Sequence, residues 1–322
     1  MTQRLCSCSA RPALVVVGLV ALSANLLLDA APTAPQINGF AVHNSLVPVA
    51  EIHAGGPDRD GIPAIDQPRF VEAEAVDFLT RDDEILGLVY QGEARAYPIK
   101  IMNWHEIVND RIKGEPIAIT YCPLCGSGIA FSAEQAGREL SFGVSGLLYN
   151  SDLLLYDRQT ESLWSQIAKQ AIAGPLAGSK LTALPLTHTT WGAWRRAHPQ
   201  TQVLSTETGH RRNYDRAPYG GYSSHGELYF PVSARSKRYH PKERVLGVEV
   251  NGQFKAYPFA ELSQTDGRVS DQLGGESIEV RFDWAQPSAR AFDAEGNPLP
   301  ATTLFWFAWY AFHPETEVYQ AN

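Results

Sequence analysis

Apolar and polar residues alternate in two adjacent runs near residue 90. The runs cover residues 85–90 and 94–97, and Gln91 and Gly92 join them. Alternation of this kind turns one face of each run toward a core, and a short link that contains glycine favours a tight reversal, so we predict a β-hairpin. Pro98 suits the first position of a helix, and we expect a short helix over residues 99–108.

Further along the chain, two β-rich runs flank a turn that carries two cysteines. These runs cover residues 117–121 and 129–131. A second helix is expected over residues 191–197, and it ends before Pro199 because the residue before a proline avoids helical geometry. Hairpins dominate and no strand–helix–strand period is present, so we predict an α+β fold with largely antiparallel strands and short helices.

Two stretches of the chain recur. Residues 84–98 match residues 244–258 at a shift of 160 positions (247 − 87), and residues 191–203 match residues 306–318 at a shift of 115 positions (306 − 191). Between these blocks one inserted residue raises the shift to 161, so the second copy lacks about 46 residues (161 − 115). Collinear blocks in one order predict two degenerate copies of one unit.

The pattern divides the chain into five parts, which we expect to differ in structure. The parts are a signal peptide or N-terminal membrane anchor (1–35), an irregular linker (36–73), a first repeat with the cysteine pair (74–204), a Tyr/Gly-rich connection or lid (205–242) and a shortened second repeat without the pair (243–322). We expect the five tyrosines between residues 214 and 239 to pack the connection.

Composition and charge narrow the possible partners. The chain has 322 residues, 44% of them hydrophobic, with a formal net charge of −8, and no cluster of lysine or arginine stands out. A protein that neutralises a phosphate backbone needs a basic surface, so we exclude nucleic acid as a partner. A partner of another kind, whether a small molecule or a protein, is not indicated.

The N-terminal segment resembles an export signal. Arg4 and Arg11 precede an uncharged apolar stretch over residues 12–28, and positive residues ahead of such a stretch place the rest of the chain outside the cytoplasm. Its length lies between that of a signal-peptide core and that of a short membrane span, and no small-x-small cleavage motif comes after it, so cleavage and anchoring both stay open. We expect a periplasmic or otherwise extracytoplasmic protein, secreted or anchored.

Cys122 and Cys125 are the two cysteines of the exported part, in the run Tyr-Cys-Pro-Leu-Cys-Gly over residues 121–126. A strand, this turn and a second strand form the shape of a metal knuckle, as in rubredoxins and zinc ribbons. A second CxxC pair is missing, so further ligands must come from elsewhere, and His105 is the nearest candidate. Two thiolates and an imidazole suit copper or zinc, and we favour copper, in a site that could serve a metal-dependent oxidoreductase.

A comparison of the two copies helps to distinguish residues of a functional site, which only the first copy has, from structural residues, which both copies keep. The second copy has Asp283 at the position of Cys122, no histidine at that of His105, and no counterpart of residues 142–186. Within that missing segment, Asp152 and Asp157 are the carboxylates that we expect to act as ligand or proton acceptor.

Two other interpretations of the cysteine pair stay open. One is a metal-free thiol-disulfide oxidoreductase, although the helix that comes after a thioredoxin-like CxxC, and lowers the pKa of its first thiol, is absent from the pattern. The other is a structural or partner-binding module with an inert disulfide, as an oxidising compartment allows.

Several of these runs resemble those of a bacterial and archaeal family, the domain of unknown function 3179. The matching runs are residues 103–110, 121–126, 142–146, 150–153 and 156–162 together with Trp164. The likeness extends from about Glu74 to the C-terminus. It implies membership of the family and implies no particular activity.

Overall fold

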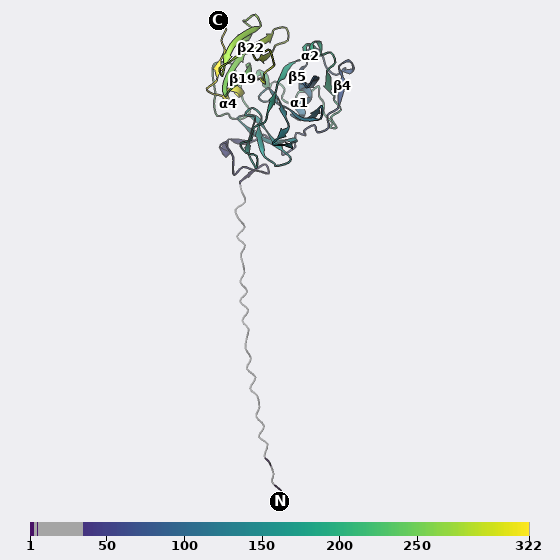
Figure 1. Ribbon diagram of the computed structural model, residues 1–322, viewed down its shortest axis with the longest axis vertical. Helices are drawn as coiled ribbons and strands as arrows, with labels where there is room; N and C mark the ends of the chain where they lie inside the picture. The colour runs from purple at the N-terminus through teal and green to yellow at the C-terminus, as the bar shows by residue number, and fades with distance from the viewer. Residues whose placement is uncertain (3–4, 6–34, 322) are drawn as a thin grey trace. The chain divides into compact units, whose positions relative to one another are not determined.

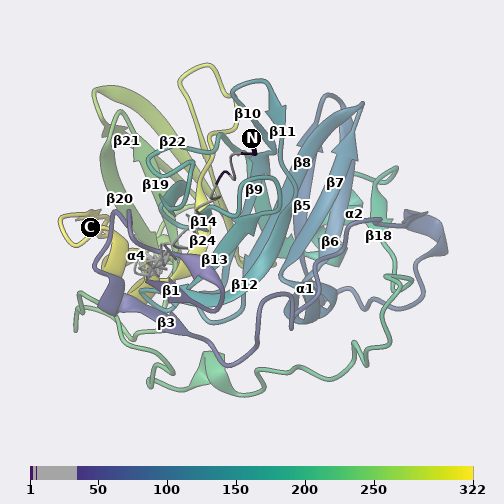
Figure 2. The same cartoon turned by 90° about the horizontal axis from the view of Figure 1, so that it is seen from below.

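Strands dominate the computed structural model, which describes residues 1–2, 5 and 35–321. They hold 41% of the residues against 12% for helices, and five sheets are arranged as the blades of a five-bladed β-propeller (Figure 2). Residues 35–321 form one compact unit. The predicted export segment, residues 1–35, lies almost wholly outside the described residues.

The blades contain three to five strands each, in the following orders. The first blade, which carries the cysteines, contains β16 (Ala183–Leu184), β9 (Ser127–Ser132), β8 (Glu115–Cys122) and β7 (Ile107–Ile112), and the second contains β15 (Gln170–Ala173), β14 (Leu163–Ser165), β13 (Asp152–Asp157), β12 (Phe142–Tyr149) and β3 (Ile52–Ala54). The third blade contains β17 (Leu186–Thr190), β5 (Glu84–Tyr90), β6 (Glu93–Pro98), β18 (Gln202–Leu204) and β4 (Phe70–Glu72). The fourth contains β24 (Thr302–Phe305), β19 (Arg244–Val250), β20 (Gln253–Pro258) and β25 (Glu317–Val318), and the fifth contains β21 (Arg268–Leu273), β22 (Glu276–Asp283) and β23 (Ser288–Phe292).

The remaining elements are small. Two hairpins pair β1 (Gln36–Ile37) with β2 (Phe40–Ala41) and β10 (Glu134–Gln135) with β11 (Arg138–Glu139). The α-helices are α1 (Ile99–His105), α2 (Trp191–Ala197), α3 (Phe259–Leu262) and α4 (Trp306–Phe312), and 3-10 turns occur at Val49–Glu51, Ala73–Ala75 and Tyr222–Ser224. None of these described helices is long and apolar enough to cross a membrane.

The predicted α+β fold built from two copies is therefore wrong. Its two helices exist, but each has only seven residues and lies at a strand end, and the class is decided by strands that the pattern did not show. Residues 142–157 form β12 and β13, whose side chains are buried on both faces along nearly their whole length. Strands buried on both faces lack the alternation that identifies a strand in sequence.

The recurring stretches fall on corresponding strands of different blades within the one propeller. β5 pairs with β6 in the register that β19 takes with β20, so Gly87 faces Ala96 as Gly247 faces Ala256. Figure 1 shows β5, α1 and α2 grouped on one side and β19, β22 and α4 on the other. The sequence match is thus a likeness between blades and their helices.

The largest apolar cluster lies where the first, second and fourth blades meet. It contains the cysteine turn, Trp164 of β14, and Phe305 and Trp306 at the junction of β24 and α4. The backbone N–H of Phe305 donates to the carbonyl of Cys125 at 2.8 Å. The cysteines are therefore held in the interior of the molecule.

Candidate metal centre

The cysteine turn joins β8 directly to β9. Cys122 ends β8 and faces Ser127, the first residue of β9, which confirms the predicted strand, turn and strand without a following helix. Gly126 closes the turn with a φ of +61°, and a Cβ there would lie 3.0 Å from the ring of Phe305. Glycine is therefore favoured both by the backbone conformation and by the close packing of the fourth blade.

Both sulfurs lie beside a carboxylate from the second blade. One ligand atom each from Cys122, Cys125 and Asp152 all fall within 4.8 Å of one another. The three side chains are 1%, 0% and 0% exposed. Asp152 begins β13, so the pairing of the first two blades brings its carboxylate to the cysteine turn.

Asp152 has one satisfied and one unsatisfied oxygen. Oδ2 accepts a hydrogen bond from the N–H of Ile167 at 3.0 Å and another from Ser165 Oγ at 3.4 Å. Oδ1 is buried and has no hydrogen-bond partner within the described part of the chain. Burial raises the pKa of Asp152 to about 8. An orphaned carboxylate oxygen at the sulfurs is the arrangement that a bound cation would satisfy.

The two cysteines are free thiols in this structure. Both Sγ atoms point at the carbonyl oxygen of Ser151, at 3.9 Å from Cys122 and 3.3 Å from Cys125. Burial raises the pKa of Cys125 well above its ordinary value, and the neighbouring Cys122 and Asp152 raise it further. Without a cation, Cys125 is thus an inactive thiol at neutral pH, since the thiolate is the reactive and metal-binding form.

A buried lysine faces the same cluster. Lys242 is 5% exposed, and its Nζ lies 3.2 Å from the centre of the Tyr222 ring and donates to the Glu227 carbonyl at 3.1 Å. Burial lowers its pKa to about 8, and negative charge on Cys125 acts in the opposite direction. Among the described residues it forms no salt bridge with a carboxylate, and Cys125 is the acidic group whose negative charge, when present, would favour its protonated form.

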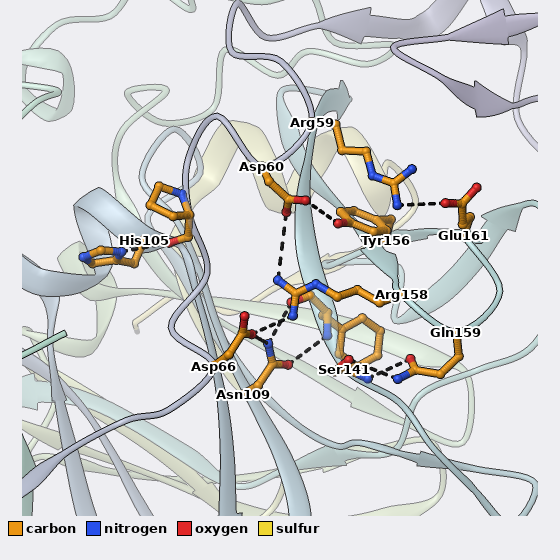
Figure 3. Close-up of polar contacts among 12 residues, drawn as sticks. Arg59, Asp60, Asp66, His105, Asn109, Ser141, Tyr156, Arg158, Gln159 and Glu161 are labelled. Carbon is orange, nitrogen blue, oxygen red and sulfur yellow. Dashed lines mark hydrogen bonds and ion pairs between the residues drawn. The ribbon is translucent and has the colours of Figure 1, made fainter. Parts of the chain in front are cut away.

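The structure places His105 away from this cluster. Its Nδ1 lies 2.8 Å from the carbonyl oxygen of Pro63, and its Nε2 lies 2.8 Å from the hydroxyl of Tyr214. Because a carbonyl only accepts, the neutral ring donates from Nδ1 and accepts from Tyr214 at Nε2. Burial lowers the pKa of His105 to about 4. Figure 3 shows the ring beside the loop that carries Asp60 and Asp66. His105, the predicted third ligand, therefore has both ring nitrogens engaged in hydrogen bonds, and the group that lies beside the two sulfurs is the carboxylate of Asp152.

Asp157 stabilises a turn. Its oxygens accept from the N–H of Thr160 at 2.6 Å, from the Thr160 hydroxyl at 2.8 Å and from Trp164 Nε1 at 2.9 Å. The structure thus brings Asp152, and not Asp157, to the sulfurs.

Polar side chains on either side of Asp157 bind the segment of residues 59–66. Arg158 contacts Asp66 at 2.6 Å, Tyr156 donates to Asp60, and the guanidinium of Arg59 lies 4.3 Å from the centre of the Tyr156 ring (Figure 3). Asn109 joins the network through Asp66 at 2.7 Å. These motif residues fix the path of residues 59–66 across the first two blades.

Residues 205–242, the predicted connection or lid, cross the molecule as a long coil from β18 to β19 along the lower edge of Figure 2. Three side chains of the segment reach the site. The hydroxyl of Tyr219 donates to Glu106 Oε1 at 3.1 Å, Tyr222 is buried against Lys242, and Lys242 faces Cys125. This segment shows no periodic pattern in the sequence, and its many tyrosines were the one feature that indicated buried side chains.

Glu106 is a buried acidic residue that lines the space beside Cys122. It ends α1 in the left-handed region, with a φ of +58°, and this reversal turns its side chain inward. Burial raises the pKa of Glu106 to about 7, and the hydrogen bond from Tyr219 opposes that rise. Its signal in the sequence was its position beside His105 and before a β-rich run.

Comparison with known proteins identifies a family. A family model described as a protein of unknown function (DUF3179) matches residues 59–316. No curated protein and no solved structure matches the chain.

Proposed function

The chain belongs to the DUF3179 family of proteins of unknown function, and we propose that it is a metal-binding protein with Cys122, Cys125 and Asp152 as ligands. The observation that carries the proposal is the unpartnered Oδ1 of Asp152, fully buried beside two buried sulfurs. An isolated buried carboxylate is costly, and coordination of a cation is one of the few arrangements that offset the cost.

The donor set bears on the metal. Thiolates select Cu(I) and Zn²⁺, while a carboxylate oxygen is an ordinary ligand of zinc and a poor one for Cu(I). With Asp152 in place of His105, zinc becomes our first choice and copper the alternative. A fourth position beyond three protein ligands is the usual feature of a catalytic zinc site, where the metal acts as a Lewis acid or activates water.

Lys242 supports the same proposal through charge. Two thiolates and one carboxylate carry three negative charges, so a divalent cation leaves one uncompensated. The buried ammonium of Lys242 can balance that charge, and negative charge on Cys125 stabilises its protonated form. We further propose that the protein works outside the cytoplasm, because its first residues resemble an export signal or anchor.

Thiol-disulfide exchange is the second candidate, because both cysteines are free and Cys122 lines a cavity. Deep burial and the raised pKa of Cys125 disfavour it, since exchange requires an accessible thiolate. A structural disulfide is the third interpretation.

The test is metal analysis of the purified protein before and after incubation with Zn²⁺ or Cu⁺. We expect about one ion per chain in the wild type and a loss of at least tenfold in affinity in Cys122→Ser. His105→Asn is the control, and it should retain the metal. If neither Zn²⁺ nor Cu⁺ binds the folded wild type, the proposal is refuted. A mixed disulfide trapped by Cys125→Ser would favour the redox alternative.

A further inference from the structure

A cavity of about 230 Å³ lies between the cysteine turn and the 205–242 segment. The turn contributes Cys122, Pro123 and Leu124, and β12 and β13 contribute Val144, Leu148 and Leu153. Cys122 is the metal ligand that reaches this space, whereas Cys125 and Asp152 do not line it. The cavity therefore adjoins one side of the proposed metal centre.

The wall of the cavity is mainly apolar. Aliphatic side chains of the second blade form its buried floor, and the aromatic rings of Tyr219, Tyr229 and Phe230 close it from the opposite side. By contrast, the hollow bordered by Asp110, Arg111 and Glu139 is lined by charged side chains. An apolar wall with few polar groups is the usual character of a small-molecule site.

Two polar groups in this wall face each other. The Tyr219 hydroxyl donates to Glu106 Oε1 at 3.1 Å, and both residues line the cavity. Glu106 Oε2 takes part in none of the hydrogen bonds found among the described residues. At one end of the cavity, Glu106 can therefore accept a hydrogen bond from a donor group of a ligand, while the rest of the wall offers only apolar contact.

The rim of the cavity leads to solvent. Tyr229 is 60% exposed and Pro57 is exposed, whereas Leu124, Val144 and Leu153 at the floor are buried. A volume of 230 Å³ corresponds to roughly eight water molecules at about 30 Å³ each, and it lies below the range of about 300–1,000 Å³ for larger ligands. The occupant is thus a compact molecule that enters beside Tyr229.

We propose that this cavity binds a small apolar molecule with one hydroxyl or similar donor group, held at Glu106 and Tyr219 beside Cys122. The inference deepens the proposed function, on which it rests for its role, because it names the substrate class of the metal centre. Phenol has the required size and a single donor, and benzene is the matched molecule without the donor.

The experiment measures binding of phenol and benzene to the full-length protein by ligand-observed NMR titration. We expect phenol to bind at least about tenfold more tightly than benzene, because its hydroxyl donates to a buried carboxylate. Glu106→Gln and Tyr219→Phe should each remove most of that difference. Tyr239→Phe is the matched control, because Tyr239 lies in the same segment but donates to Glu261 outside the cavity.

A further variant fills the space itself. Val144→Phe should abolish binding of both probes, and the folded state of each variant is checked by circular dichroism. If Val144→Phe does not fold, the Tyr219→Phe and Tyr239→Phe pair still decides the matter. Equal affinity for phenol and benzene, no binding of either, or the same loss in Tyr239→Phe as in Tyr219→Phe would overturn the inference.

Metal content of the same samples separates this inference from the function on which it rests. Selective phenol binding by metal-loaded protein supports both. Metal binding without phenol binding overturns the cavity assignment and leaves the metal centre standing. Selective phenol binding by protein that takes up no metal refutes the metal centre and, with it, the assignment of phenol-like molecules as its substrates.

Discussion

At the scale of single residues, the site is defined by charges that the fold buries without an obvious partner. Asp152 and Lys242 are both almost wholly inside the protein, and burial shifts the pKa of each toward its neutral form. The sequence identified Asp152 as a candidate ligand or proton acceptor. It did not identify Lys242, because a lysine in an irregular polar stretch is normally solvated.

We expect Lys242→Met to weaken metal binding by about tenfold. The substitution keeps the length of the side chain beside Tyr222 but removes the positive charge near Cys125. Competition with a chelator of known affinity measures the change. Lys237→Met, an exposed lysine of the same segment, should leave the affinity unchanged, and an equal effect of both variants would argue for a general charge effect.

His105 should make the stability of the protein depend on pH. Its folded pKa of about 4 lies below the ordinary value of 6.5, so between these values the unfolded chain takes up a proton that the folded chain does not. The free energy of unfolding should therefore fall as pH falls through this window, by on the order of 2 kcal/mol.

Urea denaturation at pH 7 and pH 4.5 measures that dependence. His105→Asn keeps a donor toward Pro63 and cannot be protonated, so its stability should change less between the two pH values than that of the wild type. An identical pH dependence in both proteins would contradict the account.

At the scale of elements, the helices, hairpins and turns with local sequence signals were predictable, and the strands buried on both faces were not. The hairpin of β5 and β6, the helices α1 and α2, and the turn between β8 and β9 all follow local signals. The expected helix over residues 99–108 overshoots, because Glu106 adopts a left-handed conformation and β7 begins at Ile107. β12 and β13, which carry Asp152, were not predicted as strands because they are buried on both faces and so lack alternation.

The recurring packing of strand and helix leads to an element-scale prediction. A Cβ at Gly87 would lie 2.4 Å from the Trp194 ring, and a Cβ at Gly247 would lie 2.3 Å from the Trp309 ring. Gly87→Ala and Gly247→Ala should therefore each destabilise the protein, by about 1–3 kcal/mol, because neither indole can move without disturbing its helix.

Urea denaturation compares these two variants with Gly220→Ala. The position of Gly220 is open and has ordinary backbone geometry, so that variant should keep the wild-type midpoint. A large difference between the effects at Gly87 and Gly247 would show that the two blades pack differently in solution.

At the scale of the whole molecule, the site depends on contacts between blades that are distant in sequence. Cys122 comes from the first blade, Asp152 from the second and Lys242 from the coil before the fourth. Spacing along the chain could not reveal this meeting, because it depends on how the five sheets surround a common centre. The sequence therefore named Cys122, Cys125 and Asp152 as candidates, but it could not show that Asp152, and not His105, lies beside the two sulfurs.

The fourth and fifth blades should not fold alone. Phe305 and Trp306 belong to the same apolar cluster as the cysteine turn, and Phe305 donates its N–H to the carbonyl of Cys125. A fragment of residues 243–322 would expose that surface, so we expect its circular dichroism to lack a cooperative thermal transition. A cooperative transition would show that these two blades form an independent domain.

The most direct measurement of the central claim is X-ray absorption at the metal edge of the loaded protein, compared between the wild type and Asp152→Asn. The account predicts two sulfur neighbours near about 2.3 Å and lighter neighbours at roughly 2.0–2.2 Å for zinc, with a loss of affinity of at least about tenfold in Asp152→Asn. The imidazole signature of a histidine ligand, or unchanged binding in Asp152→Asn, would contradict it.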